Sequence, residues 1–233
     1  MKSATTSHAI SDWLVPVALL ALAFIPIAAG AYRLSTLASG VPVTANNLRF
    51  VASPIPVVLH IFSVTIYSVL GAFQFSTGFR RRWPGWHRAA GRILVVAGLV
   101  AVLSGLWMAL FYAIVPADTP LLHALRLIFG AGMALSLVLG LVAIRAGNVA
   151  RHQDWMRRAY AIGLGAGTQA LILIAPIMIF GTLDPDTYAL LMGAAWIINL
   201  GIAEWLIQRP KRSRRPSPGT LPLAGVIAKD ERP

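Results

Sequence analysis

The chain has 233 residues, of which 57% are hydrophobic and only 12% charged, and it carries a formal net charge of +12 and no cysteine. A soluble domain has about 25% charged residues, so an ordinary soluble globular fold is excluded. The lack of cysteine excludes disulfides, thiolate metal sites, iron–sulfur clusters and thiol chemistry, and leaves histidine as the strong metal ligand.

The apolar residues gather in six runs, each long enough for a helix that crosses the roughly 30 Å bilayer core, which takes about 20 residues. In chain order the runs are 12–32, 54–76, 86–114, 121–144, 154–180 and 188–207. The first run is longer than the apolar stretch of a typical signal peptide, so we expect it to stay as a helix. The runs predict an all-α, polytopic membrane protein with six transmembrane helices.

The predicted helices make one membrane domain, residues 1–208, followed by a tail, residues 209–233. The tail is rich in Pro, Arg and Ser, and this composition predicts a disordered basic segment. We find no internal repeat of useful length, no phosphate-binding glycine loop and no nucleophile motif in the chain.

Arginine is distributed unequally between the two sides of the predicted bundle. The connections after the second and fourth runs, together with the tail, carry most of it: Arg80, Arg81, Arg82, Arg88, Arg145, Arg151, Arg157, Arg158, Arg209, Arg212, Arg214 and Arg215. The opposite loops carry Asp118, Asp184 and Asp186, with Arg33 and Arg49 as their only cations. Basic loops stay on the cytoplasmic side, so we expect both termini in the cytoplasm and the chain in the inner (cytoplasmic) membrane. The same sorting explains the net charge without a nucleic-acid partner, and the basic loops would attract anionic lipid.

Four histidines lie at ends of the middle four helices. His60 and His123 are near the outer ends of the second and fourth helices, whereas His87 and His152 are at the inner ends of the third and fifth. His8, in the N-terminal tail, is set aside. If helices two to five form a square with chain neighbours adjacent, each pair faces across one diagonal. Facing imidazoles are what a b-type haem needs on its two sides, so the layout predicts two haem b groups, one on His60 and His123 and one on His87 and His152.

Several glycines share the helix faces of these histidines, at spacings that return to the same face. They are Gly71, Gly98, Gly105, Gly130 and Gly163. We expect them either to leave room for haem or to allow close helix packing, as small residues do in membranes.

Two arginines within the apolar runs are further candidates for the site. Arg126 is one turn beyond His123 and would either bind a haem propionate or extend to the nearby interface. Arg92 would serve the inner haem or, as we slightly prefer, pair with Glu204 of the sixth helix. For His87 and His152 a role as ordinary interfacial residues also stays open, because tryptophan and arginine surround them.

The histidine layout resembles the ascorbate-reducible diheme cytochrome b family of six-helix membrane proteins. The resemblance implies haem ligation by four histidines paired two-with-four and three-with-five, and the segment from His87 to Gly91 is similar to that family's third-helix start. Nothing else in the chain matches, so the ascorbate site is not carried over.

The chain is also similar to a family of bacterial predicted integral membrane proteins, the domain-of-unknown-function 2306 type, over about residues 54–180. The sequence segments that carry this likeness are His60 with Gly71 and Gln74, His87-Arg88 with Gly91, and His152 with Trp155-Met156 and Arg158. It supports the fold and implies no particular chemistry.

Three functions therefore stay open. The first is a diheme b-type cytochrome that carries electrons across the membrane, a transmembrane oxidoreductase with a separate electron donor and acceptor. The second is a transporter that uses histidine for a proton or a metal ion. The third is a cofactor-free membrane subunit or assembly factor.

Overall fold

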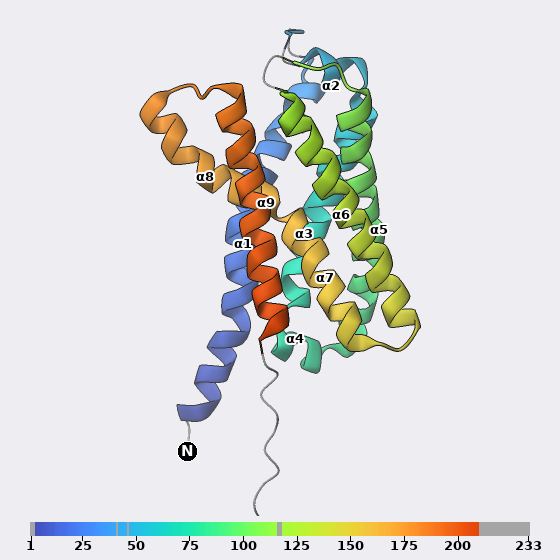
Figure 1. The fold of residues 1–233 in the computed structure, drawn as a ribbon. Helices are drawn as coiled ribbons and strands as arrows, with labels where there is room; N and C mark the ends of the chain where they lie inside the picture. Colours follow the sequence, from blue (N-terminus) through green and yellow to red (C-terminus); the bar gives the residue numbers. More distant parts are fainter. Residues whose placement is uncertain (1–2, 41, 46, 116–117, 210–233) are drawn as a thin grey trace, which may run out of the picture.

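The computed structural model describes residues 3–40, 42–45, 47–115 and 118–209, and within them the chain forms nine helices and no strand (Figure 1). The helices are α1 Ser3–Ala38, α2 Leu48–Ala52, α3 Pro54–Gln74, α4 Thr77–Arg82, α5 Pro84–Phe111, α6 Pro120–Arg145, α7 Val149–Gly163, α8 Gly165–Phe180 and α9 Pro185–Gln208. Of the predicted tail, residues 210–233 lie outside the described residues.

Within the part of the chain that the structure describes, six spans are long and apolar enough to cross a membrane: α1, α3, α5, α6, the pair α7–α8, and α9. The predicted all-α, six-span architecture is confirmed. Four of the spans begin at a proline, namely Pro54, Pro84, Pro120 and Pro185. Proline suits the first helical position because the backbone N–H that it lacks has no partner there. Three of these four spans, α5, α6 and α9, therefore start one to three residues before the apolar runs that predicted them.

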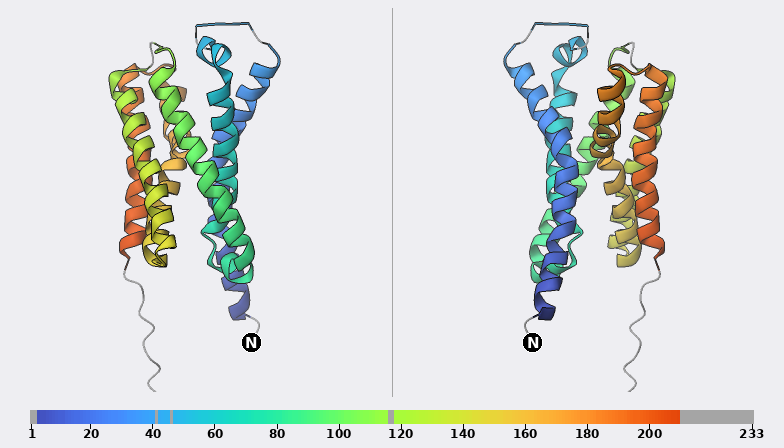
Figure 2. Two further views of the ribbon diagram at one scale, coloured as in Figure 1. Left: turned by 90° about the vertical axis from the view of Figure 1, so that its right-hand side faces the viewer. Right: turned by 90° about the vertical axis from the view of Figure 1, so that its left-hand side faces the viewer.

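The middle four spans form the predicted square. Helix α3 packs on α5, α5 on α6, α6 on α7 and α7 on α3, while α1 lies against α3 and α8, and α9 lies against α6, α7 and α8 (Figures 1 and 2). The chain runs up and down, so α2 and the described residues 112–115 and 118–119 lie at one end of the bundle. Helix α4 and the turn at 146–148 lie at the other end (Figure 1). We name these the Asp118 end and the Arg151 end.

The fifth span is broken at Leu164, which the apolar pattern did not indicate. Helix α8 leaves the line of α7 at this point (Figure 1). Polar side chains brace the break: Asn199 Nδ2 donates to the carbonyl oxygen of Ala161 at 3.0 Å, and Thr168 Oγ1 donates to Asn199 Oδ1 at 2.8 Å. Broken helices are tolerated in membranes when neighbouring side chains satisfy the freed backbone groups in this way.

Candidate functional site

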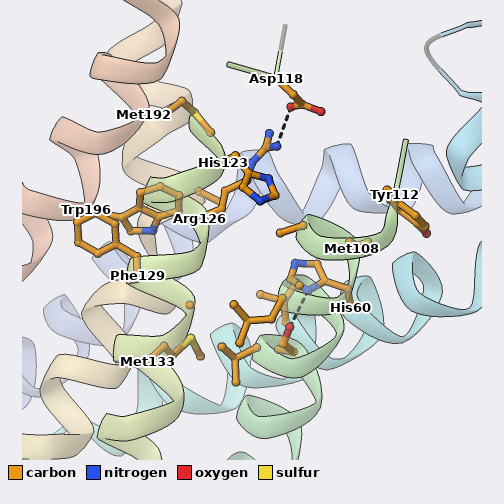
Figure 3. Close-up of a pocket in the computed structure, with 18 of the residues that line it drawn as sticks. His60, Met108, Tyr112, Asp118, His123, Arg126, Phe129, Met133, Met192 and Trp196 are labelled. Carbon is orange, nitrogen blue, oxygen red and sulfur yellow. Dashed lines mark hydrogen bonds and ion pairs between the residues drawn. The ribbon is translucent and has the colours of Figure 1, made fainter. Parts of the chain in front are cut away.

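A cavity of about 750 Å³ opens at the Asp118 end, where α8 has left the line of α7 (Figure 3). Its size falls within the range of ligand pockets, roughly 300–1,000 Å³. Most of its wall is apolar, and Met108, Phe129, Met133, Met192 and Trp196 contribute to it. Polar groups are few, and they include His60 and His123. The structure thus brings together at one cavity the two histidines that the sequence predicted as a pair.

His60 is fixed by the neighbouring helix. Its Nδ1 lies 2.8 Å from the carbonyl oxygen of Ala101 on α5. A carbonyl oxygen can only accept, so this bond places the ring proton on Nδ1 and leaves the Nε2 lone pair free. Gly105 lies beside the ring, since a methyl group there would be 3.2 Å from Cε1. A backbone carbonyl on the second ring nitrogen is the usual arrangement around a metal-ligating histidine.

The mouth of the cavity holds two arginines that share one carboxylate. Arg49 Nη1 lies 2.5 Å from Asp118 Oδ2, and Arg126 Nη1 lies 2.6 Å from Asp118 Oδ1. Partial burial alone would raise the pKa of Asp118, but hydrogen bonds from the two guanidinium groups outweigh it and hold this pKa below its ordinary value. The cluster has a net positive charge, and Arg49 Nε is buried without a partner.

This cluster modifies the prediction for Arg126. We expected its partner to be a propionate or the interface, whereas in the structure it is Asp118. Asp118 precedes α6 by two residues, and its carboxylate reaches Arg126 in the second turn of that helix. Arg126 still lines the cavity, with Asp118 beside it (Figure 3).

The second pair of histidines lies at the Arg151 end. His152 Nδ1 is 2.9 Å from the carbonyl oxygen of Gly140 on α6, which again leaves Nε2 free. His87 Nδ1 is buried and has no hydrogen-bond partner. The two rings belong to different core helices, His87 to the first turn of α5 and His152 to the first turn of α7. A methyl group added at Gly91, one turn along α5 from His87, would meet nothing, so there is open space at this position.

Glu204 pairs with Arg158 and not with Arg92, so our preferred pairing was wrong. Arg158 Nε and Nη2 lie 2.5 Å and 2.9 Å from the two carboxylate oxygens, a bidentate geometry that ties α7 to α9. Its guanidinium carbon also lies 4.6 Å from the ring centroid of Trp155. Because α9 packs on α7, the arginine of that helix is the one within reach.

The glycines on the histidine faces do point into the bundle, but protein side chains fill most of the space beside them. The nearest neighbour is Tyr160 at Gly71, Tyr67 at Gly98 and Gly163, and Leu106 at Gly130. Of these glycines, only Gly105 faces a histidine. Close packing is therefore the role of most of them.

Sequence reasoning missed the Asp118 cluster, the two carbonyl anchors and the break at Leu164. Gly163, Gly165 and Gly167 are spaced two apart around that break and were the available signal for it. The carbonyl groups that hold His60 and His152 leave no signal in the sequence, because every residue has a backbone carbonyl oxygen.

The fold and the site together define a polytopic, all-helical membrane protein with histidines at both ends of a four-helix core. The family described as "Predicted membrane protein (DUF2306)" matches residues 57–207, and the chain belongs to this family. The match includes all four core histidines and extends into α9, further than the segment that suggested the likeness. No curated protein and no solved structure gives a significant match.

Proposed function

We propose that this protein is a diheme b-type cytochrome that carries electrons across the membrane. One observation supports it most strongly. Each end of the core has one imidazole, His60 or His152, held at Nδ1 by a carbonyl of the adjacent helix and free at Nε2. Such anchoring fixes the tautomer and the ring orientation that iron ligation requires. A second histidine from another core helix accompanies each anchored one.

The residues at the Asp118 end fit a haem in chemistry and in size. His60 and His123 would supply the axial nitrogens, and the apolar wall would hold the macrocycle away from water. Arg49 and Arg126 each contact Asp118 through Nη1, and their other N–H groups would be available to haem propionates. At the other end, the unpartnered Nδ1 of His87 is a buried polar atom that a ligand or a bound water would satisfy.

Bis-imidazole haem supplies one-electron transfer without an open coordination position. The chain's own contribution is to orient four imidazoles and to exclude water from the core. Its arginines balance charge at the mouth of the cavity. Two sites at opposite ends of one bundle would divide the crossing into shorter steps.

We further propose that the Arg151 end faces the cytoplasm and that the protein lies in the inner membrane. The support is the arginine asymmetry between the two ends, which follows the positive-inside rule. The native chain lacks cysteine, so single substitutions can be labelled with an impermeant thiol reagent in intact cells. Asp184→Cys should react from outside and Arg151→Cys should not, and the reverse pattern would overturn the orientation.

The alternative functions receive less support. Among the described residues, no group of three or more His, Cys, Asp or Glu side chains comes together as a metal site. A metal-transport function would therefore depend on histidine pairs alone. A cofactor-free role would explain the two carbonyl bonds as the hydrogen bonds that buried imidazoles need, but it would give the Nε2 atoms no partner.

Single histidine variants test the diheme proposal. Loss of one axial ligand leaves a five-coordinate iron, so His60→Ala and His123→Ala should remove or make high-spin the same component in a redox titration of the visible spectrum. His87→Ala and His152→Ala should affect the other component. The matched control is His8→Ala, which should leave both intact. Four histidine variants with unrelated phenotypes, or none, would exclude the pairing.

A further inference from the structure

Two tyrosines fill the centre of the four-helix core. Tyr67 of α3 and Tyr160 of α7 are 4% and 5% exposed, and their ring centroids are 5.6 Å apart. The Tyr160 hydroxyl donates to the carbonyl oxygen of Ser68 at 2.8 Å. Phe75 lies against Tyr160, at a centroid distance of 4.8 Å. The three rings thus form a continuous aromatic contact between α3 and α7.

Glycines on the facing helices make room for these rings. A methyl group at Gly98 of α5 would lie 2.8 Å from the Tyr67 ring, and one at Gly163 of α7 would lie 2.9 Å from it. Gly71 of α3 receives Tyr160 in the same way. Each tyrosine therefore packs against a glycine on the helix that carries the other tyrosine. At these two points the tyrosine rings fill the space between α3 and α7.

The tyrosines lie between the two histidine sites. Met133 and Gly163 line the cavity, and a methyl group at Gly163 would meet both Tyr67 and Met133, which places Tyr67 next to the cavity wall. Tyr67 is seven residues along α3 from His60, and Tyr160 is eight along α7 from His152. At 1.5 Å per residue, each ring is roughly 10–12 Å along its helix from the histidine.

Most side chains around the rings are apolar and buried. They come from the remaining core helices and from α7: Leu94, Ala97, Leu137 and Ala159. Ser68 and Ser136 are buried polar residues at the same level, and the Ser136 hydroxyl donates to the carbonyl oxygen of Gly132. A water molecule needs two to four polar partners to occupy an internal site, and the apolar residues provide none with their side chains. At this level the Tyr67 ring lies against α5 at Gly98 and against α7 at Gly163, and Leu137 of α6 lies beside it.

We propose that Tyr67 and Tyr160, with the apolar side chains around them, form a dry layer that separates the cavity from the histidines at the Arg151 end and blocks protons and water. This goes beyond the proposed function and does not depend on haem. In an electron carrier, the layer would let charge cross as electrons while preventing a parallel leak of protons.

Proton flux into liposomes tests the layer directly. The full chain is reconstituted with a pH-sensitive dye inside, and a potassium diffusion potential drives protons. The wild type and the Tyr67→Phe/Tyr160→Phe variant, which keeps both rings, should be as tight as protein-free liposomes. The Tyr67→Ser/Tyr160→Ser variant removes both rings and adds hydroxyls that hold water, so its flux should rise severalfold. A wild type that conducts as fast as the Ser variant would overturn the proposal. A folded Ser variant as tight as the Phe variant would also overturn it.

A second measurement does not depend on the folding of the Ser variant. Ala97→Cys puts a thiol in the layer with little change in volume, and Ala109→Cys puts one in the cavity wall. A small hydrophilic thiol reagent should label the cavity position and leave the layer position unreacted from both sides of the membrane. Equal labelling of the two positions would show that water reaches the layer, and the proposal would be wrong.

Discussion

Replacement of Asp118 by asparagine removes the charge that holds the mouth of the cavity together. The carboxylate side chain is 10% exposed, and those of Arg49 and Arg126 are 18% and 34% exposed. The substitution keeps one acceptor oxygen in nearly the same shape. It leaves two guanidinium groups close together without an anion between them.

The size of the effect follows from these exposures. A hydrogen bond to a charged group contributes a net of about 1.5–3 kcal/mol when it is buried. The bond to Arg126 is worth less, at most about 1 kcal/mol, because solvent screens it. With one acceptor retained, we expect a loss of about 2 kcal/mol in the free energy of unfolding. For a chain of this length, that corresponds to a fall of about 4–8 °C in Tm.

The assay is thermal unfolding of the purified protein in detergent, followed by circular dichroism. Asp186→Asn is the matched control, because Asp186 is exposed in the first turn of α9. Its loss should cost only about 0.5 kcal/mol, mainly through the helix dipole. If Asp118→Asn lowers Tm no more than the control does, the two ion pairs do not stabilise the mouth and this reasoning is refuted.

Three other predictions follow from the same structure. Because the pKa of Asp118 is lowered in the folded state, the ionised carboxylate stabilises the fold at neutral pH, and this contribution is lost as the pH falls below about 4. In that range the Tm of the wild type should drop more steeply than the Tm of Asp118→Asn. Parallel curves of Tm against pH would count against the lowered pKa. Gly98→Ala should displace the Tyr67 ring and cost about 1–3 kcal/mol in a denaturation assay, whereas Gly201→Ala, which meets open space, should cost nothing. Asn199→Leu removes the brace at the helix break and should lower stability by about 1 kcal/mol; an unchanged Tm would show that the break holds without it.

The sequence was sufficient for the architecture because the relevant physics is local. Apolar runs of membrane-spanning length and the prolines that precede them fix where helices lie, and short connections make chain neighbours adjacent. The square that follows brings His60 and His123 to one cavity without any knowledge of side-chain contacts.

What the sequence could not provide depends on contacts between distant segments. Arg158, not Arg92, meets Glu204 because α9 packs on α7, and no pattern within one helix encodes which helices become neighbours. Asp118 lies in a connecting loop, and its pairing with Arg49 requires helix α2 of another connection to lie beside that loop. The glycines on the histidine faces could either leave room for haem or allow close helix packing, and the choice depends on which group faces each glycine. Tyrosine rings face three of them.

The haem content of the purified wild-type protein tests the central proposal most directly. The full chain is produced in haem-replete cells, purified in mild detergent, and measured as a reduced-minus-oxidised absorption spectrum, with haem and protein quantified on the same sample. We predict low-spin b-type bands and about two haems per chain, one for each histidine pair. A spectrum without haem bands would contradict the diheme proposal, and the histidines would then have to serve another purpose.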